Sequence, residues 1–189
     1  MNMTRHPKHL LSTVARRLCP AILAFVFAFT PSFSRGHAAP AESVPPPRCD
    51  SPSCVVMDAI SGEVLFEKNA RERRAPASVT KVMTLLLTLE DVAAGKVSLR
   101  DKVAASTNAW EMGGTEVWAE PGEIMELEEW IKAVAVASAN DGAVILAEYI
   151  AGTEEAFVAR MNERARELGM LDTTFQNSHG LDAENHLTT

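Results

Sequence analysis

Two short apolar runs open the regular part of the chain: "CVVMD" at 54–58 and "EVLFEK" at 63–68, separated by the turn sequence "AISG". β-Branched and aromatic residues bounded by turn residues are typical of strands, so these runs predict a hairpin whose turn contains Gly62. From residue 77 the pattern lengthens to "ASVTKVMTLLLTLEDVAAG", which is apolar on most sides and ends at Gly95. A long apolar segment closed by glycine predicts a buried helix.

Three further helices are predicted by the apolar patterns at 125–138, 140–152 and 153–169. The last of them has a good N-cap in Thr153, acidic residues in its first turn and Gly169 after its end. Residues 98–123 are rich in turn signals instead, and we expect them to be irregular.

This order of elements predicts an α+β domain. An antiparallel hairpin usually needs further strands beside it, and no clear strand pattern follows residue 170. We therefore expect residues 54–189 to be the N-terminal part of a longer domain.

The first 41 residues differ sharply in charge from the rest. They hold five of the 18 basic residues and none of the 25 acidic ones, and so carry a net charge of +5. Residues 42–189 carry a net charge of −12, which gives −7 for the whole chain. The apolar run "AILAFVFAF" at 21–29 follows basic residues and precedes the small residues "GHAAPA". This is the pattern of a secretory signal peptide, here cleaved near Ala38 or Ala41, with an uncleaved signal anchor as the alternative. The acidic remainder argues against nucleic acid and anionic lipid as partners.

Residues 42–53 contain "VPPPR" and are predicted to be a linker. Cys49 lies within this linker, and Cys54 directly follows it. In an exported protein they could be joined, because the intervening "DSPS" suits a turn. Two free thiols are the equally open alternative.

Histidine-based chemistry has little support in the sequence. Beyond the signal peptide only His179 and His186 remain, in "NSHGLDAENH". A serine hydrolase of the Ser-His type would need one of them as its base, and the G-x-S-x-G motif is absent. Zinc binding by these histidines together with Asp182 or Glu184 would lack a recognisable ligand spacing. We prefer to interpret the segment as a polar loop.

A better candidate for chemistry is Ser78-Val79-Thr80-Lys81. A serine nucleophile needs a nearby base, and residues three apart on a helix share a face. Burial in an apolar helix lowers the pKa of a lysine, so that Lys81 could accept the serine proton. The alternative is that Ser78 simply caps the helix. Lys81 favours the functional interpretation, because a lysine in the first turn of an apolar helix opposes the helix dipole and is poorly placed for stability.

A second polar group is expected to help the proton reach the leaving group. Ser-x-Asn occurs at Ser106-Thr107-Asn108 and again at Ser138-Ala139-Asn140. The first lies in the irregular stretch, and the second lies between two apolar helices. Capping of the following helix would explain Ser138 structurally. We prefer Ser138 and Asn140, because a polar cluster between buried helices can line a cleft beside another helix start.

Together these residues resemble the penicillin-recognising serine peptidases, whose signature is Ser-x-x-Lys, Ser-x-Asn and a later Lys-Thr-Gly. More narrowly, the chain resembles the D-alanyl-D-alanine carboxypeptidases of the low-molecular-mass penicillin-binding class, peptidase family S11. The similarity runs from about Val55 to the end of the chain. It covers the blocks "MDAISGEVLFEKNARERRAPASVTKVMT", "NAWEMGGTEVW", "SANDGAVILAEYIAGTEEAFVARMN" and "ELGMLDTTFQNSHGLD".

The resemblance implies a β-lactamase/transpeptidase-like α+β fold and a role for each motif residue. Ser78 would attack the D-Ala-D-Ala bond of a peptidoglycan stem peptide and form an acyl-enzyme, with Lys81 as its general base. Ser138 would relay a proton to the departing D-alanine, and Asn140 would position Lys81 and the substrate amide. No metal or organic cofactor is implied. β-Lactam antibiotics are expected as covalent inhibitors, and a periplasmic or other extracytoplasmic location is expected for the protein.

Two features of the family are absent from the sequence. Neither Lys-Thr-Gly nor a C-terminal amphipathic membrane anchor occurs in these 189 residues. We expect the gene to continue into a strand that carries Lys-Thr-Gly, and this stretch alone to be inactive. A peptidoglycan D,D-endopeptidase, a β-lactamase or a non-catalytic wall-binding protein on the same fold are the alternatives.

Overall fold

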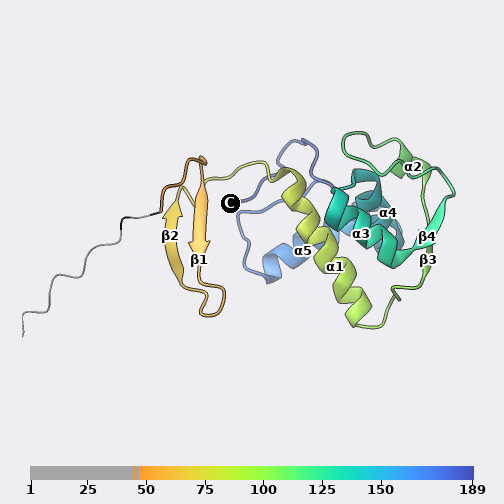
Figure 1. Ribbon diagram of the computed structural model, residues 1–189, viewed down its shortest axis with the longest axis horizontal. Coiled ribbons are helices and arrows are strands. Elements are labelled where there is room, and N and C mark those ends of the chain that lie inside the picture. Colours follow the sequence, from red (N-terminus) through yellow and green to blue (C-terminus); the bar gives the residue numbers. More distant parts are fainter. Residues whose placement is uncertain (1–44, 46) are drawn as a thin grey trace, which may run out of the picture. The chain divides into compact units, whose positions relative to one another are not determined.

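The computed structural model describes Pro45 and residues 47–189 (Figure 1). The predicted signal peptide, 1–41, and the first part of the predicted linker lie outside the described residues. The elements follow one another in the order β1 (Cys54–Met57), β2 (Val64–Lys68), the 3-10 turn η1 (Ala77–Thr80), α1 (Lys81–Ala93), β3 (Lys102–Ala104), α2 (Thr107–Trp110), β4 (Ile124–Glu126), α3 (Leu127–Ala137), α4 (Asn140–Ala151) and α5 (Glu154–Glu167).

Strands β1 and β2 form the predicted antiparallel hairpin, in which Cys54 pairs with Lys68. Asp58 holds the turn, because its Oδ1 accepts the backbone N–H groups of Ile60 and Ser61 at 3.1 and 2.7 Å. A short acidic side chain that bonds the backbone ahead of it is a common way to close such a turn. Cys49 and Cys54, whose state the sequence left open, are both free thiols.

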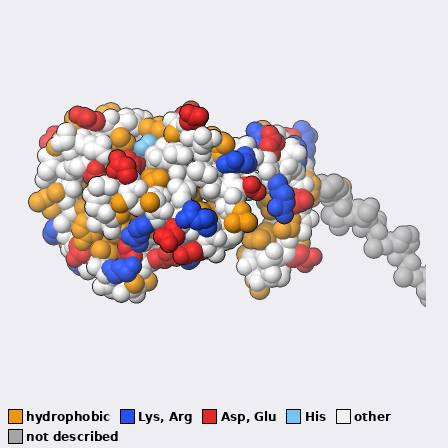
Figure 2. All heavy atoms as spheres, turned by 180° about the vertical axis from the view of Figure 1, so that it is seen from behind, with side chains coloured by type: hydrophobic (Ala, Val, Ile, Leu, Met, Phe, Trp, Pro, Cys, Tyr) orange, Lys and Arg blue, Asp and Glu red, His pale blue; other side chains and the backbone are white. Residues whose placement is uncertain are grey.

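Apolar side chains of the hairpin remain at the surface (Figure 2). Val55 is 51% exposed, and Leu65 on the other strand is 61% exposed. A two-stranded hairpin is marginally stable by itself and needs another element against its apolar side chains. Within the part of the chain that the structure describes, no helix has the length and apolar character that a membrane span requires.

Residues 98–126, predicted to be irregular as far as 123 and helical from 125, contain short elements that the sequence pattern did not predict, and helix α3 begins only at Leu127. Residues Lys102–Ala104 pair with Ile124–Glu126 as the antiparallel strands β3 and β4. Between them lies α2, which is a single turn capped by Ser106. Strands of three residues are too short to show a period in the sequence, which explains the error.

Helix α4 is the centre of the helical packing and contacts α1, α2, α3 and α5 (Figure 1). All residues from Asn140 to Ala147 are buried. On one side α4 packs in a core with Trp130 of α3, and on the other in a core with Leu87 of α1 and Phe157 of α5. Burial of such large side chains stabilises the fold by about 2 kcal/mol each. These two cores fix the start of α4 relative to the start of α1.

Candidate active site

Ser78 lies in a tight turn that precedes α1. The turn η1 is a 3-10 helix, and the α-helix proper begins only at Lys81. Neither η1 nor α1 has a side-chain cap, so the interpretation of Ser78 as an ordinary N-cap is wrong. Ala77, directly before it, has a φ of 47°, a left-handed value that is uncommon for alanine. The turn presents the Ser78 side chain as an exposed group.

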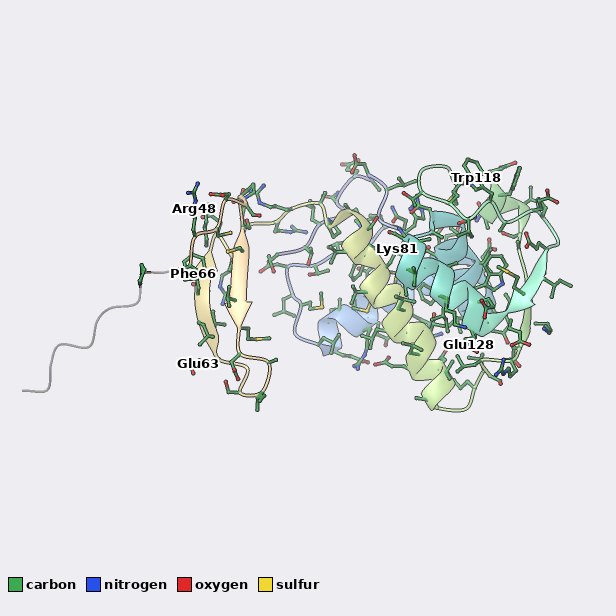
Figure 3. The ribbon with its side chains drawn as sticks, viewed as in Figure 1. Arg48, Glu63, Phe66, Lys81, Trp118 and Glu128 are labelled. Atoms are coloured by element: carbon green, nitrogen blue, oxygen red, sulfur yellow. The ribbon has the colours of Figure 1, made fainter. Side chains whose placement is uncertain are left out.

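Lys81 is the first residue of α1 and only 3% exposed (Figure 3). Its Nζ donates to Asn140 Oδ1 at 2.7 Å and to the carbonyl oxygen of His179 at 2.7 Å. The same Nζ lies 3.4 Å from Ser78 Oγ. Burial lowers the pKa of Lys81 from its usual value. The structure therefore places a buried amine with a lowered pKa beside the exposed serine.

Asn140 comes to Lys81 through the turn between α3 and α4. Ser138 ends α3 in a left-handed conformation, with a φ of 58°, and Asn140 is the first residue of α4. The Asn140 backbone N–H donates to the carbonyl of Thr115 at 2.7 Å, and its Nδ2 donates to the carbonyl of Gly113 at 2.9 Å. Because the amide nitrogen is committed to Gly113, the amide oxygen faces Lys81.

Ser138 is less closely involved than the other three predicted residues. It does not cap α4, whose N-cap is Ala139 without a side-chain bond. Among residues 47–189, the Ser138 hydroxyl makes no hydrogen bond, and it does not line the pocket beside Ser78. Its assignment as a proton relay stays a prediction.

The competing Ser-x-Asn motif has a local structural role. Ser106 Oγ accepts the backbone N–H of Ala109 at 3.0 Å and so caps α2. Asn108 donates through Nδ2 to Glu148 at 3.0 Å. Both side chains are thus engaged away from Lys81, in keeping with the preference for Asn140.

The loop 177–181 belongs to the site, although its sequence predicts only a polar loop. Besides the bond from Lys81 to the His179 carbonyl, Thr84 Oγ1 of α1 donates to the Ser178 carbonyl at 2.6 Å. No residue type marks a carbonyl that binds a lysine, because every residue has a carbonyl. The one available signal was the buried threonine at position 84, one turn after Lys81.

The start of α5 holds this loop from its other side. Glu154 Oε1 accepts the backbone N–H of Ser178 at 2.9 Å and its hydroxyl at 2.7 Å. His179 is 6% exposed, and burial lowers the pKa of its ring, while the charge of Glu154 acts in the opposite direction. The loop is therefore anchored both to α1 and to α5.

Gly180 lies against the backbone of the turn that carries Ser78. Its φ is 96°, and a Cβ at this position would overlap the carbonyl of Ala77 and lie 3.1 Å from Ser78 N. Only glycine allows this close approach. An open pocket of about 310 Å³ results beside Ser78, and the residues that line it are Ala77, Ser78, Gly114, Thr115, Asn140, His179, Gly180, Leu181 and Asp182.

Comparisons with known proteins identify the family of the chain. Residues 40–189 match the peptidase S11 family, D-alanyl-D-alanine carboxypeptidase. The D-alanyl-D-alanine carboxypeptidase DacF of Bacillus subtilis (strain 168) is 46% identical over 140 residues, which are 74% of this chain and 36% of the relative. The crystal structure of the D-alanyl-D-alanine carboxypeptidase DacD from Francisella tularensis is 37% identical with a TM-score of 0.73, over 75% of this chain and 34% of that one.

A further relative has been solved with ampicillin bound. Penicillin-binding protein D2 from Listeria monocytogenes, in the ampicillin-bound form, is 28% identical with a TM-score of 0.65 and covers 73% of this chain and 56% of its own. The chain thus spans about a third to a half of the length of these relatives. The structural matches confirm the predicted transpeptidase-like fold over the part that is present. The chain belongs to the peptidase S11 family of D-alanyl-D-alanine carboxypeptidases.

Proposed function

We propose that the whole protein is a serine-type D-Ala-D-Ala carboxypeptidase, which removes the terminal D-alanine of peptidoglycan stem peptides through an acyl-enzyme on Ser78. Membership of the family supports the class of reaction. The contacts of Lys81 support the roles of the residues. The activity is proposed for the complete gene product, because the chain spans only part of its relatives.

The proposal rests on the three polar contacts of Lys81 Nζ. A neutral amine has two N–H bonds and one lone pair. Asn140 Oδ1 and the His179 carbonyl, both at 2.7 Å, can accept the two N–H groups, and the lone pair is then left for the hydroxyl of Ser78 at 3.4 Å. Burial favours this neutral form, because it disfavours the ammonium. Lys81 is in this way prepared to accept a proton from Ser78.

The proposed reaction has two halves, which are acylation of Ser78 and hydrolysis of the acyl ester. As Ser78 Oγ attacks the carbonyl carbon of the D-Ala-D-Ala bond, its proton passes to Lys81 Nζ, and the backbone N–H of Ser78 helps to stabilise the negative oxygen. Collapse of the tetrahedral intermediate breaks the C–N bond, and the departing amine takes a proton that Lys81 supplies through Ser138. Water next attacks the acyl ester and gives a proton to Lys81. As the C–O bond to Ser78 breaks, Lys81 returns this proton to Ser78 Oγ, which releases the shortened peptide and restores both residues. Asn140 keeps Lys81 in place throughout.

The same nucleophile is proposed to react with β-lactams, which acylate such serines. The Listeria relative solved with ampicillin supports this expectation for the family. Because the substrate is a cell-wall peptide, we also propose that the protein acts outside the cytoplasm, in accord with the signal peptide predicted at 1–41.

Covalent labelling of the protein expressed from its complete open reading frame tests the proposal. Wild-type protein is expected to bind fluorescent penicillin and to release D-alanine from a pentapeptide, whereas Ser78→Ala should do neither. Ser106→Ala is the matched control: it removes a helix cap worth about 1 kcal/mol but should still be labelled. Labelling of Ser78→Ala would refute the assignment of Ser78. An unlabelled wild type would refute the function, and cleavage of cross-linked dimers without release of D-alanine would favour the endopeptidase.

A further inference from the structure

A buried side-chain bond joins the nucleophile turn to the far end of the described chain. Thr80, inside the Ser78–Lys81 motif, is 1% exposed, and His186 is 2% exposed. Thr80 Oγ1 and His186 Nε2 lie 2.7 Å apart although the residues are 106 positions apart in sequence. Neither residue takes part in the chemical steps proposed above.

The second ring nitrogen of His186 decides the direction of this bond. Nδ1 faces the backbone N–H of Gln176 at 2.9 Å, and a backbone N–H can only donate. Nδ1 is therefore the unprotonated nitrogen, so the hydrogen of the neutral ring is on Nε2 and is donated to Thr80 Oγ1. Burial lowers the pKa of His186, which favours the neutral ring.

The ring itself is held firmly in place. It packs edge-on against Phe175, with ring centroids 5.9 Å apart. The residue that follows, Leu187, exchanges two backbone hydrogen bonds with Thr174 at 2.8 and 3.0 Å. The imidazole is thus a rigid donor that can impose a position on the threonine.

The segment that carries His186 also runs along the approach to the nucleophile turn. Thr188 and Arg74 exchange two backbone hydrogen bonds, each of 2.8 Å. The chain just before the turn is in this way tied through the backbone at Arg74, and the last residue of the turn is tied through the side chain of Thr80. Ser78 lies between the two ties.

From this geometry we propose that His186 and Thr80 are positioning residues for acylation, because their bond holds the 3-10 turn so that Ser78 Oγ stays within reach of Lys81 Nζ. This inference rests on the proposed function. The distance of 3.4 Å between Oγ and Nζ is at the long end of a hydrogen bond, so a small outward movement of the turn would break it. Misplacement of a reacting group by 1 Å costs on the order of 100-fold in rate.

Thr80→Val in the complete gene product is the direct test. Valine keeps the shape of threonine but cannot accept the hydrogen of His186. We expect the rate constant of acylation by fluorescent penicillin to fall about ten-fold or more, with little change in the affinity for the unreacted drug. Thr80→Ser restores an acceptor and should recover most of the loss. The matched control is Thr88→Val on helix α1, which follows the turn: Thr88 is also buried, bonds the carbonyl of Thr84 in its own helix, and its valine variant should acylate like the wild type.

A double-mutant cycle with His186→Ala separates positioning from general damage to the core. If the two residues act through one bond, the double variant should acylate no more slowly than the slower single variant. The inference would be overturned if the double variant lost rate by the product of the two single losses, or if Thr80→Val acylated at the wild-type rate. The proposed function would still stand in either case. A wild-type protein that is not acylated would refute the proposed function instead. Thermal melting of each variant checks that the folded protein is being measured.

Discussion

Gly180 offers the sharpest test of how the loop 177–181 shapes the site. A methyl group at this position would overlap the carbonyl of Ala77, the residue before the proposed nucleophile, and would lie 3.1 Å from Ser78 N. Both partners are backbone, so no flexible side chain can move aside. We therefore consider Gly180→Ala, which adds a single carbon atom.

Two effects of this substitution can be estimated. A φ of 96° is strained for alanine and costs roughly 1–3 kcal/mol in the free energy of unfolding. The overlap can be relieved only if one of the two backbones moves by about 1 Å, which for a reacting group costs on the order of 100-fold in rate. We expect acylation of Gly180→Ala by penicillin to be slower by that order, in a protein that still folds.

The assay is the acylation rate of the complete gene product with fluorescent penicillin, measured beside its thermal melting temperature. Gly169→Ala is the matched control, because its φ is 77° and nothing lies within 4 Å of the added carbon. It should lose similar stability through backbone strain and yet acylate normally. If Gly180→Ala acylated as fast as Gly169→Ala, the proposed dependence of Ser78 on this close approach would be wrong.

Two other predictions follow from buried polar side chains. Burial lowers the pKa of Lys81, so the fraction of neutral amine should rise with pH. The acylation rate should rise with it and reach half its maximum below the pKa of an exposed lysine. An acylation rate that is flat or falls over this range would contradict the role of Lys81 as base. Asp141 is 1% exposed and accepts the backbone N–H groups of Val117 and Ala119. Asp141→Ala should therefore lower the free energy of unfolding, measured by urea titration, by roughly 3 kcal/mol. Asp172 is exposed, so Asp172→Ala should change this free energy little.

Much of the local structure was predictable from the sequence, because it depends on short-range patterns. The hairpin at 54–68 and the helices that became α1, α3, α4 and α5 were found from apolar periodicity and turn residues. The three-residue strands β3 and β4 were not, because pairing with a distant partner rather than their own pattern makes them strands. The cap at Thr153 was also predicted, and its Oγ1 accepts the backbone N–H of Ala156.

In the candidate site too, short-range contacts could be predicted from the sequence and long-range contacts could not. By itself the sequence determined that Ser78 and Lys81 are neighbours, because a separation of three residues in a helical turn brings two side chains together whatever surrounds them. The position of Asn140 between two apolar helices favoured it over Asn108. Only the tertiary structure decided that the Asn140 amide meets Lys81, that the His179 carbonyl binds Lys81 and that the His186 ring bonds Thr80. These contacts span 59, 98 and 106 residues of sequence. The packing of α4 between two cores and the close approach at Gly180 set their geometry, which no local pattern contains.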